Sequence, residues 1–164
     1  MSRKSNGVAG IFDGDGGGGV IRHTTAASPA AVLLNEELHS NRIFLLDTIY
    51  TTAGLTVRLP RATGTGNKYT VWNNAVQTVS CLVTVTSLDT MVGPAIMMEA
   101  VGGTDDTVFY ASGTSDTITM NATTTGGLSG DLIEAIDARA GIWLVRLMLF
   151  PSGDTVTPFS ATIS

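Results

Sequence analysis

Short segments rich in Val, Ile, Thr and aromatic residues follow one another along most of the chain, separated by clusters of Gly, Asn, Asp and Ser. The segments are Ile43–Tyr50, Leu55–Leu59, Lys68–Trp72, Val79–Thr86, Met91–Ala100, Thr107–Tyr110, Thr117–Ala122, Asp131–Ile136, Ile142–Phe150 and Thr157–Ile163. Many short strands with glycine-rich turns between them are typical of β-sandwiches and barrels. Helical patterns of the length that a βαβ unit needs are absent from the sequence. The chain is therefore predicted to be all-β, with a jelly-roll-like sandwich or barrel.

Alternation of apolar and polar residues predicts which face of a strand is buried. In Leu55–Leu59 the apolar residues face inward, whereas Thr56 and Arg58 face outward. Ile142–Phe150 is apolar on both faces apart from Arg146. A strand of this kind is covered on both sides. The second cover is either the opposite sheet or a neighbouring subunit, and the pattern favours neither.

Residues 1–28 differ from the rest, because they have little periodicity and much glycine, above all in Asp13–Gly19. Glycine has the most conformational entropy to lose on ordering, so we expect this arm to be ordered where a neighbouring molecule holds it. Its candidate docking residues are the apolar Val8, Ile11, Phe12, Val20 and Ile21. The chain is thus predicted to have two parts, an extended N-terminal arm over 1–28 and a β-sandwich domain over 29–164.

The segment between arm and sandwich, Ser28–Ser40, has two interpretations. Ser28 before Pro29 has the pattern of a helix N-cap followed by the first helical residue, and Asn35–His39 could continue a helix. Alternatively, Ala31–Leu34 is a short strand that ends in a turn. The local pattern leaves both open.

Charged residues make up only 14% of the chain, against roughly 25% in ordinary soluble domains. A surface with so little charge is expected to be covered largely by other protein. Candidate interface side chains are Arg58, Trp72 and Arg146. The net charge is −5, and the basic residues are scattered. Nucleic-acid binding is not expected, because phosphate contacts need clustered Lys and Arg.

No catalytic or metal-binding motif is complete. Asp13-Gly-Asp15 resembles the start of a calcium loop, but Thr24 occupies the position that needs a bidentate Glu. His23 and His39 lie far apart in the sequence and are expected at the surface, and the lone Cys81 is expected to be a buried structural thiol. The chain is predicted not to be an enzyme and to need no cofactor or metal. It lacks a signal-peptide or transmembrane pattern, so we expect it to be made in the cytoplasm and to have no membrane partner.

Four stretches in the same order resemble the capsid decoration, or cement, proteins of tailed bacteriophages. They are Leu55–Tyr69, Ser115–Asp131, Gly141–Trp143 and Thr157–Thr162. The resemblance spans roughly residues 32–164, and the glycine-rich arm lies outside it. It also favours the short strand at Ala31–Leu34, since family members have a strand and turn there that end near a His.

The resemblance implies a jelly-roll-like sandwich that forms a homotrimer on the exterior of an icosahedral phage head. The partners would be the major capsid protein and further copies of the chain. Bridging of neighbouring capsomers stabilises a head without chemistry, because weak contacts repeated by symmetry add up. The alternative is a virion receptor-binding or carbohydrate-binding β-sandwich module, which needs an exposed aromatic or polar groove.

Overall fold

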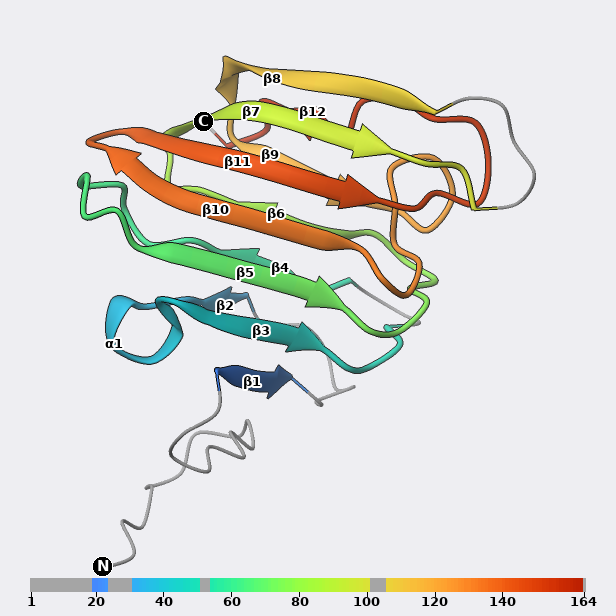
Figure 1. Cartoon of the computed structure of the whole chain (residues 1–164), viewed down its shortest axis with the longest axis horizontal. Helices are drawn as coiled ribbons and strands as arrows, with labels where there is room; N and C mark the ends of the chain where they lie inside the picture. The colour runs from blue at the N-terminus through green and yellow to red at the C-terminus, as the bar shows by residue number, and fades with distance from the viewer. Residues whose placement is uncertain (1–18, 24–30, 51–53, 101–105, 164) are drawn as a thin grey trace, which may run out of the picture.

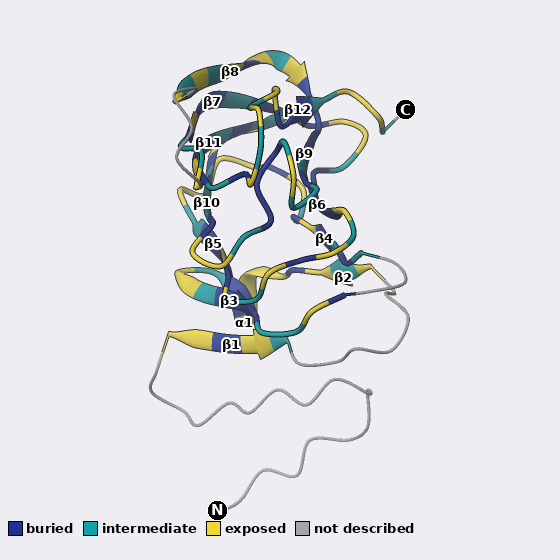
Figure 2. Ribbon diagram, turned by 90° about the vertical axis from the view of Figure 1, so that its right-hand side faces the viewer, coloured by how far each residue is buried: buried dark blue, intermediate teal, exposed yellow. Residues whose placement is uncertain are grey.

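The computed structural model describes residues 19–23, 31–50, 54–100 and 106–163. Within these ranges two β-sheets pack face to face, and one four-residue helix is the only helix (Figures 1 and 2). That helix is far too short to cross a bilayer, and no other described segment provides a membrane-spanning helix. The predicted all-β sandwich is confirmed.

The larger sheet has seven strands in the order β1-β3-β5-β10-β11-β7-β8. Their bounds are Val20–His23, Arg42–Leu46, Lys68–Asn73, Leu132–Arg139, Ile142–Leu149, Thr90–Met97 and Thr107–Ser115, in that order. The smaller sheet has the order β12-β9-β6-β4-β2. Its strands are Phe159–Ser160, Thr117–Met120, Cys81–Thr84, Thr56–Arg58 and Val32–Leu33.

Both sheets are mixed rather than purely antiparallel. In the larger sheet β1 with β3, β3 with β5, and β11 with β7 are parallel. In the smaller sheet β2, β4 and β6 run parallel to one another. The other pairs are antiparallel. Parallel neighbours need crossover connections, so the chain repeatedly passes from one sheet to the other, which ties the two layers together.

The core lies between the sheets and follows the predicted alternation. Leu55, Val57 and Leu59 are almost fully buried, whereas Arg58 is exposed. The side chain of Trp143 on β11 is fully buried and meets the ring of Tyr69 edge-on at a centroid distance of 5.5 Å.

The favoured strand interpretation of residues 31–34 is confirmed by β2, and a single helical turn, α1 (Glu36–His39), follows it. This turn begins at Asn35, whose side chain accepts a hydrogen bond from the Leu38 N–H at 2.8 Å. Capping by Asn satisfies a backbone donor that the first turn leaves free. A helix starting at Ser28 is not tested, because Ser28 and Pro29 lie outside the described residues.

Part of the predicted arm belongs to the sandwich. Val20 and Ile21, predicted to dock on a neighbour, lie in β1 at the edge of the larger sheet. Ile21 is buried in the core of its own chain, and His23 bonds the Tyr50 hydroxyl through Nδ1 at 2.6 Å. The side chain of Ile21 is therefore not available to a neighbour, since the register of β1 with β3 turns it inward. The other three predicted docking residues, Val8, Ile11 and Phe12, lie outside the described residues.

A buried carboxylate, Asp137, holds the turn at residues 63–65. It accepts hydrogen bonds from the backbone N–H groups of Thr63, Gly64 and Thr65 at 2.7 to 3.0 Å, and from the Thr65 hydroxyl at 2.8 Å. Desolvation raises the pKa of Asp137, but these donors outweigh it, so the net pKa lies below its usual value. The charged form therefore stabilises the turn.

A second buried carboxylate, Asp131, faces fewer donors. It accepts from the Gly127 N–H and, at 2.7 Å, from the Phe150 N–H. Burial raises the pKa of Asp131 to about 7 despite these two bonds. Two carboxylates that tie loops to strands thus respond to pH in opposite directions.

The raised pKa of Asp131 predicts a loss of stability as the pH rises. Its folded-state pKa of about 7 exceeds the ordinary 3.8, so the fold binds a proton that the unfolded chain releases. The contribution of this proton is fully present below about pH 4 and is lost as the pH rises through 7. Urea unfolding from pH 4 to pH 8 should show a steeper decline for the wild type than for Asp131→Asn.

Slopes are compared rather than absolute stabilities, because the amide of the substituent faces the same N–H donors. Asp154→Asn, in an exposed turn, controls for the change in net charge. Equal slopes for the wild type and Asp131→Asn would contradict the assignment.

Gly93 in β7 marks a close approach of two backbones. Its φ is 141°, and an added Cβ would lie 1.9 Å from the carbonyl oxygen of Val145 in β11. Gly93→Ala should therefore cost about 3 kcal/mol or more in unfolding free energy. Gly113→Ala in β8 is the matched control: φ is 86° there, but the space around an added Cβ is open, so its cost should be about 1 kcal/mol. Similar losses for both variants would contradict a steric role for Gly93.

Candidate functional site

The outer faces of the two sheets differ in chemistry. Register places Thr56, Thr84, Thr117 and Thr119 on the outer face of the smaller sheet, together with Arg58 and Leu82. Thr84 and Thr117 are buried there. The outer face of the smaller sheet is therefore mostly polar, although exposed Leu33 of β2 also lies on it.

The outer face of the larger sheet is apolar. A continuous row crosses it from β3 to β8: Leu45, Trp72, Leu132, Met148, Ile96 and Val108 are neighbours in register. Several of these side chains are well exposed, with 38% of Trp72, 43% of Ile96 and 65% of Val108 accessible, whereas Leu45 at the β3 end is buried. Figure 2 shows this sheet edge-on, with no other described element over its outer side. We call this surface the apolar face.

Further positions extend the apolar face on one side of this row. Ile136, Leu144 and Val92 form another apolar row across β10, β11 and β7. Between the two rows lie Pro94 and Tyr110, which are register neighbours on β7 and β8. The strong apolar character of Ile142–Phe150 on its second face is thus exposed within the described chain, not covered by the opposite sheet.

Few charges interrupt the apolar face. Lys68 pairs with Glu134 at 2.9 Å, and Arg146 is the register neighbour of Glu134 across β10 and β11. Arg146 is exposed and forms no ion pair with any described residue. The structure therefore brings two predicted interface residues, Trp72 and Arg146, onto one face, whereas Arg58 lies on the other sheet.

The size of the apolar face suits a protein partner. A residue in a sheet occupies about 16 Å² of the sheet plane, from a rise of about 3.3 Å and a strand spacing of about 4.8 Å. Only every second residue of a strand faces outward, so the residues of the two apolar rows, with Pro94 and Tyr110, cover roughly 350 Å². A patch of this extent could form the centre of an interface in which each partner buries ~800 Å², and the largest apolar patch of a soluble protein is often functional.

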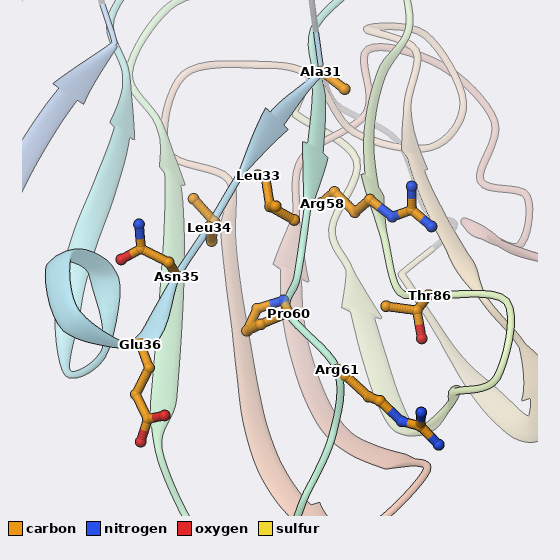
Figure 3. Close-up of a pocket in the computed structure, with 9 residues that line it drawn as sticks. All are labelled: Ala31, Leu33, Leu34, Asn35, Glu36, Arg58, Pro60, Arg61 and Thr86. Atoms are coloured by element: carbon orange, nitrogen blue, oxygen red, sulfur yellow. The ribbon is translucent and has the colours of Figure 1, made fainter.

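A groove of about 570 Å³ lies on the smaller sheet beside β2. Leu33 and Pro60 contribute to its apolar floor, and the side chains of Arg58 and Arg61 extend along one side of it (Figure 3). Both arginines are exposed, and neither pairs with an acidic side chain in the described part of the chain. This groove is the second candidate surface.

The two histidines have structural surroundings, which corrects the expectation that they lie at the surface. His39 is only 4% exposed and accepts a hydrogen bond from the Asn35 N–H through Nδ1. His23 is half-buried against Phe44 and Tyr50, and desolvation lowers its pKa. The ring of Phe44 contacts both imidazoles, at centroid distances of 5.8 Å from His23 and 5.9 Å from His39.

No group of three or more His, Cys, Asp or Glu side chains that could hold a metal ion occurs among the described residues. Cys81 is buried in β6, as predicted for a structural thiol. That the protein needs no cofactor or metal stays a prediction.

The two tryptophans report on the apolar face. Trp143 is fully buried, whereas Trp72 is on that face. In Trp143→Phe, the emission of Trp72 should be at long wavelength and strongly quenched by acrylamide, because a half-exposed indole meets water and quencher. In Trp72→Phe, the emission of Trp143 should be blue-shifted and quenched much less, because a close-packed interior excludes the quencher from a fully buried indole. Equal quenching of the two variants would contradict the orientation of β5.

Comparison of the chain with family models, curated proteins and solved structures finds no match in any of the three. The resemblance to cement proteins therefore stays a prediction from the sequence, and function has to be inferred from the surfaces described above.

Proposed function

We propose that this protein is a capsid decoration, or cement, protein: a virion structural component that binds the outer surface of a phage head and stabilises it by bridging capsomers. The single observation that carries the proposal is the apolar face of the larger sheet. Its partners would be the major capsid protein and other copies of the chain, in a homotrimer. The protein would thus be made in the host cytoplasm and act on the exterior of the virion.

The composition supports this proposal. Surface that is buried against other protein needs little charge, and the chain has only 14% charged residues. The charges on the apolar face are few, and Lys68 and Glu134 already satisfy each other. Charged residues are likewise depleted at the centre of protein interfaces.

The sandwich supports a mechanical role. Its core residues are nearly inaccessible to water, and close-packed interiors transmit strain rather than yield to it. The buried carboxylates of Asp131 and Asp137 fix two of the connections. A stiff body that touches more than one capsomer adds contacts that must break before the capsomers separate. Each contact can be weak, because copies repeated by symmetry act together. No residue is assigned a catalytic role.

The alternative function, a receptor-binding or carbohydrate-binding module, needs aromatic side chains grouped in a polar groove. The exposed aromatic side chains of the apolar face, Trp72 and Tyr110, lie on β5 and β8, with β10, β11 and β7 between them. Their neighbours in register are aliphatic or proline, namely Leu132 and Pro94. This surface favours a protein partner over a sugar.

Charge placed on the apolar face should abolish assembly. The double variant Ile96→Glu, Met148→Glu introduces two unpaired carboxylates into a surface that is desolvated on binding, which is costly. We expect it to bind phage heads at least about tenfold more weakly and to lose self-association, the equivalent of about 1.4 kcal/mol or more. Native mass and co-sedimentation with heads that lack the protein measure both effects.

Thr56→Glu, Thr119→Glu is the matched control, because it adds the same charge to the outer face of the smaller sheet. It should bind within about twofold of the wild type, as surface substitutions outside an interface usually do. A wild-type protein that stays monomeric, ignores heads and is retained on a glycan array would overturn the proposal in favour of the binding module.

A further inference from the structure

The groove beside β2 combines an apolar floor with two arginines that lack acidic partners among the described residues. Leu33 is 61% exposed, and Pro60 lies between Arg58 and Arg61 in the sequence and beside Leu33 in the groove (Figure 3). Guanidinium groups bind carboxylates through paired hydrogen bonds. The chemistry of the groove therefore fits an extended peptide that carries carboxylates next to apolar side chains.

The charges around the groove favour one orientation of such a peptide. Arg58 and Arg61 extend to the same side, with Thr86 between them, whereas Glu36 lies across the floor on the other side (Figure 3). The Glu36 carboxylate accepts a hydrogen bond from the Asn67 side chain at 2.6 Å. Carboxylates of the peptide would be attracted to the arginine side and repelled from the Glu36 side.

The chain itself contains a segment with this chemistry. Residues 11–15 read Ile-Phe-Asp-Gly-Asp and lie outside the described residues. In an extended peptide, side chains two apart point to the same side, so Asp13 and Asp15 would both face the arginines. By the same alternation Ile11 would lie on the arginine side, whereas Phe12 would point to the opposite side and supply the contact with the apolar floor.

The segment is also close enough in the chain to reach the groove. Figures 1 and 2 place β1 and β2 along the same edge of the sandwich, one in each sheet. Packed sheets lie about 10 Å apart. The residues from Asp13 to Gly19, where the described chain begins, span up to about 20 Å when extended. A chain entering β1 can therefore cross from one sheet to the other within this length.

We propose that the groove formed by Leu33, Arg58, Pro60 and Arg61 is a docking site for residues 11–15 of the same chain. Asp13 and Asp15 pair with the two arginines, and Phe12 covers the apolar floor. Docking shields two of the predicted head-docking residues in the free protein, so that a partner has to compete for them. This consequence for assembly rests on the proposed function, whereas the docking itself does not.

Chymotrypsin cleavage after Phe12 tests the docking in the full chain, because Phe12 is the only aromatic residue among residues 1–18. The cleavage rate, followed by mass spectrometry, is divided by that of a synthetic peptide of residues 6–19 with the same substitutions. We expect the wild-type chain to be cleaved at least about tenfold more slowly than its peptide. Arg58→Glu, Arg61→Glu and, separately, Asp13→Arg, Asp15→Arg should each abolish this protection. Combining all four substitutions should restore it.

The control variant Arg42→Glu, Arg139→Glu changes the net charge by the same amount at exposed positions outside the groove, and it should keep the wild-type protection. Melting temperatures verify that every variant is folded. Absence of protection in the wild type, or protection that the arginine reversal does not change, would overturn the docking site. Protection that increases with protein concentration would assign the occupant to a second copy and overturn docking within one chain. None of these outcomes depends on head binding, so failure of the docking and failure of the proposed function are distinguishable.

Discussion

Burial of the inward face of β11 is the interaction on which the rest of the sandwich depends. Trp143, Val145, Leu147 and Leu149 alternate along this strand and are almost inaccessible to water. Each large apolar side chain buried in this way contributes about 2 kcal/mol. Since β11 lies between β10 and β7 near the middle of the larger sheet, its register determines that of both neighbours. The close approach at Gly93 shows how tightly one of them is fitted to it.

Because successive side chains of a strand point to opposite faces, the alternation that buries one face of β11 leaves its other face outward. Ile142, Leu144 and Met148 point outward because the inward positions are already occupied, and the strands beside β11 continue the apolar rows. A chain that used this sheet only to make a core would have mainly polar residues at those positions, as the smaller sheet has in its threonines and Arg58, with Leu82 and Leu33 as the exceptions. The difference between the two outer faces is therefore the strongest indication of how the molecule is used.

Much of the fold could be predicted from the sequence, because a strand with one buried face shows a local alternation of apolar and polar residues. Each predicted strand overlaps an observed one, although β8 continues to Ser115 where the prediction ended at Tyr110. The β1 strand was missed, since Val20–His23 is short and follows a run of glycines, and only its pairing with β3 makes it a strand. The mixed pairing of the sheets was also out of reach, because it depends on contacts between distant parts of the chain.

The candidate surfaces were partly visible in the sequence. The second apolar side of Ile142–Phe150 indicated a covered face, but local alternation could not show whether the cover came from the opposite sheet. The Asp137 carboxylate, which meets its donors more than seventy residues earlier in the chain, left no local signal. Arg58 and Arg61 lie along one side of a groove that Leu33 of β2 helps to line, and the residue types alone do not specify which strands meet there.

The position of β8 at the edge of the larger sheet has a consequence for how much free protein a cell can tolerate. This nine-residue strand ends the larger sheet, so one row of its backbone N–H and C=O groups has no strand beside it in the described part of the chain. Exposed Val108 and Tyr110 lie on it. Long apolar edges of this kind template aggregation. Surplus free copies of the protein would therefore tend to aggregate through this edge, so a cell that makes the protein gains from keeping its free concentration low.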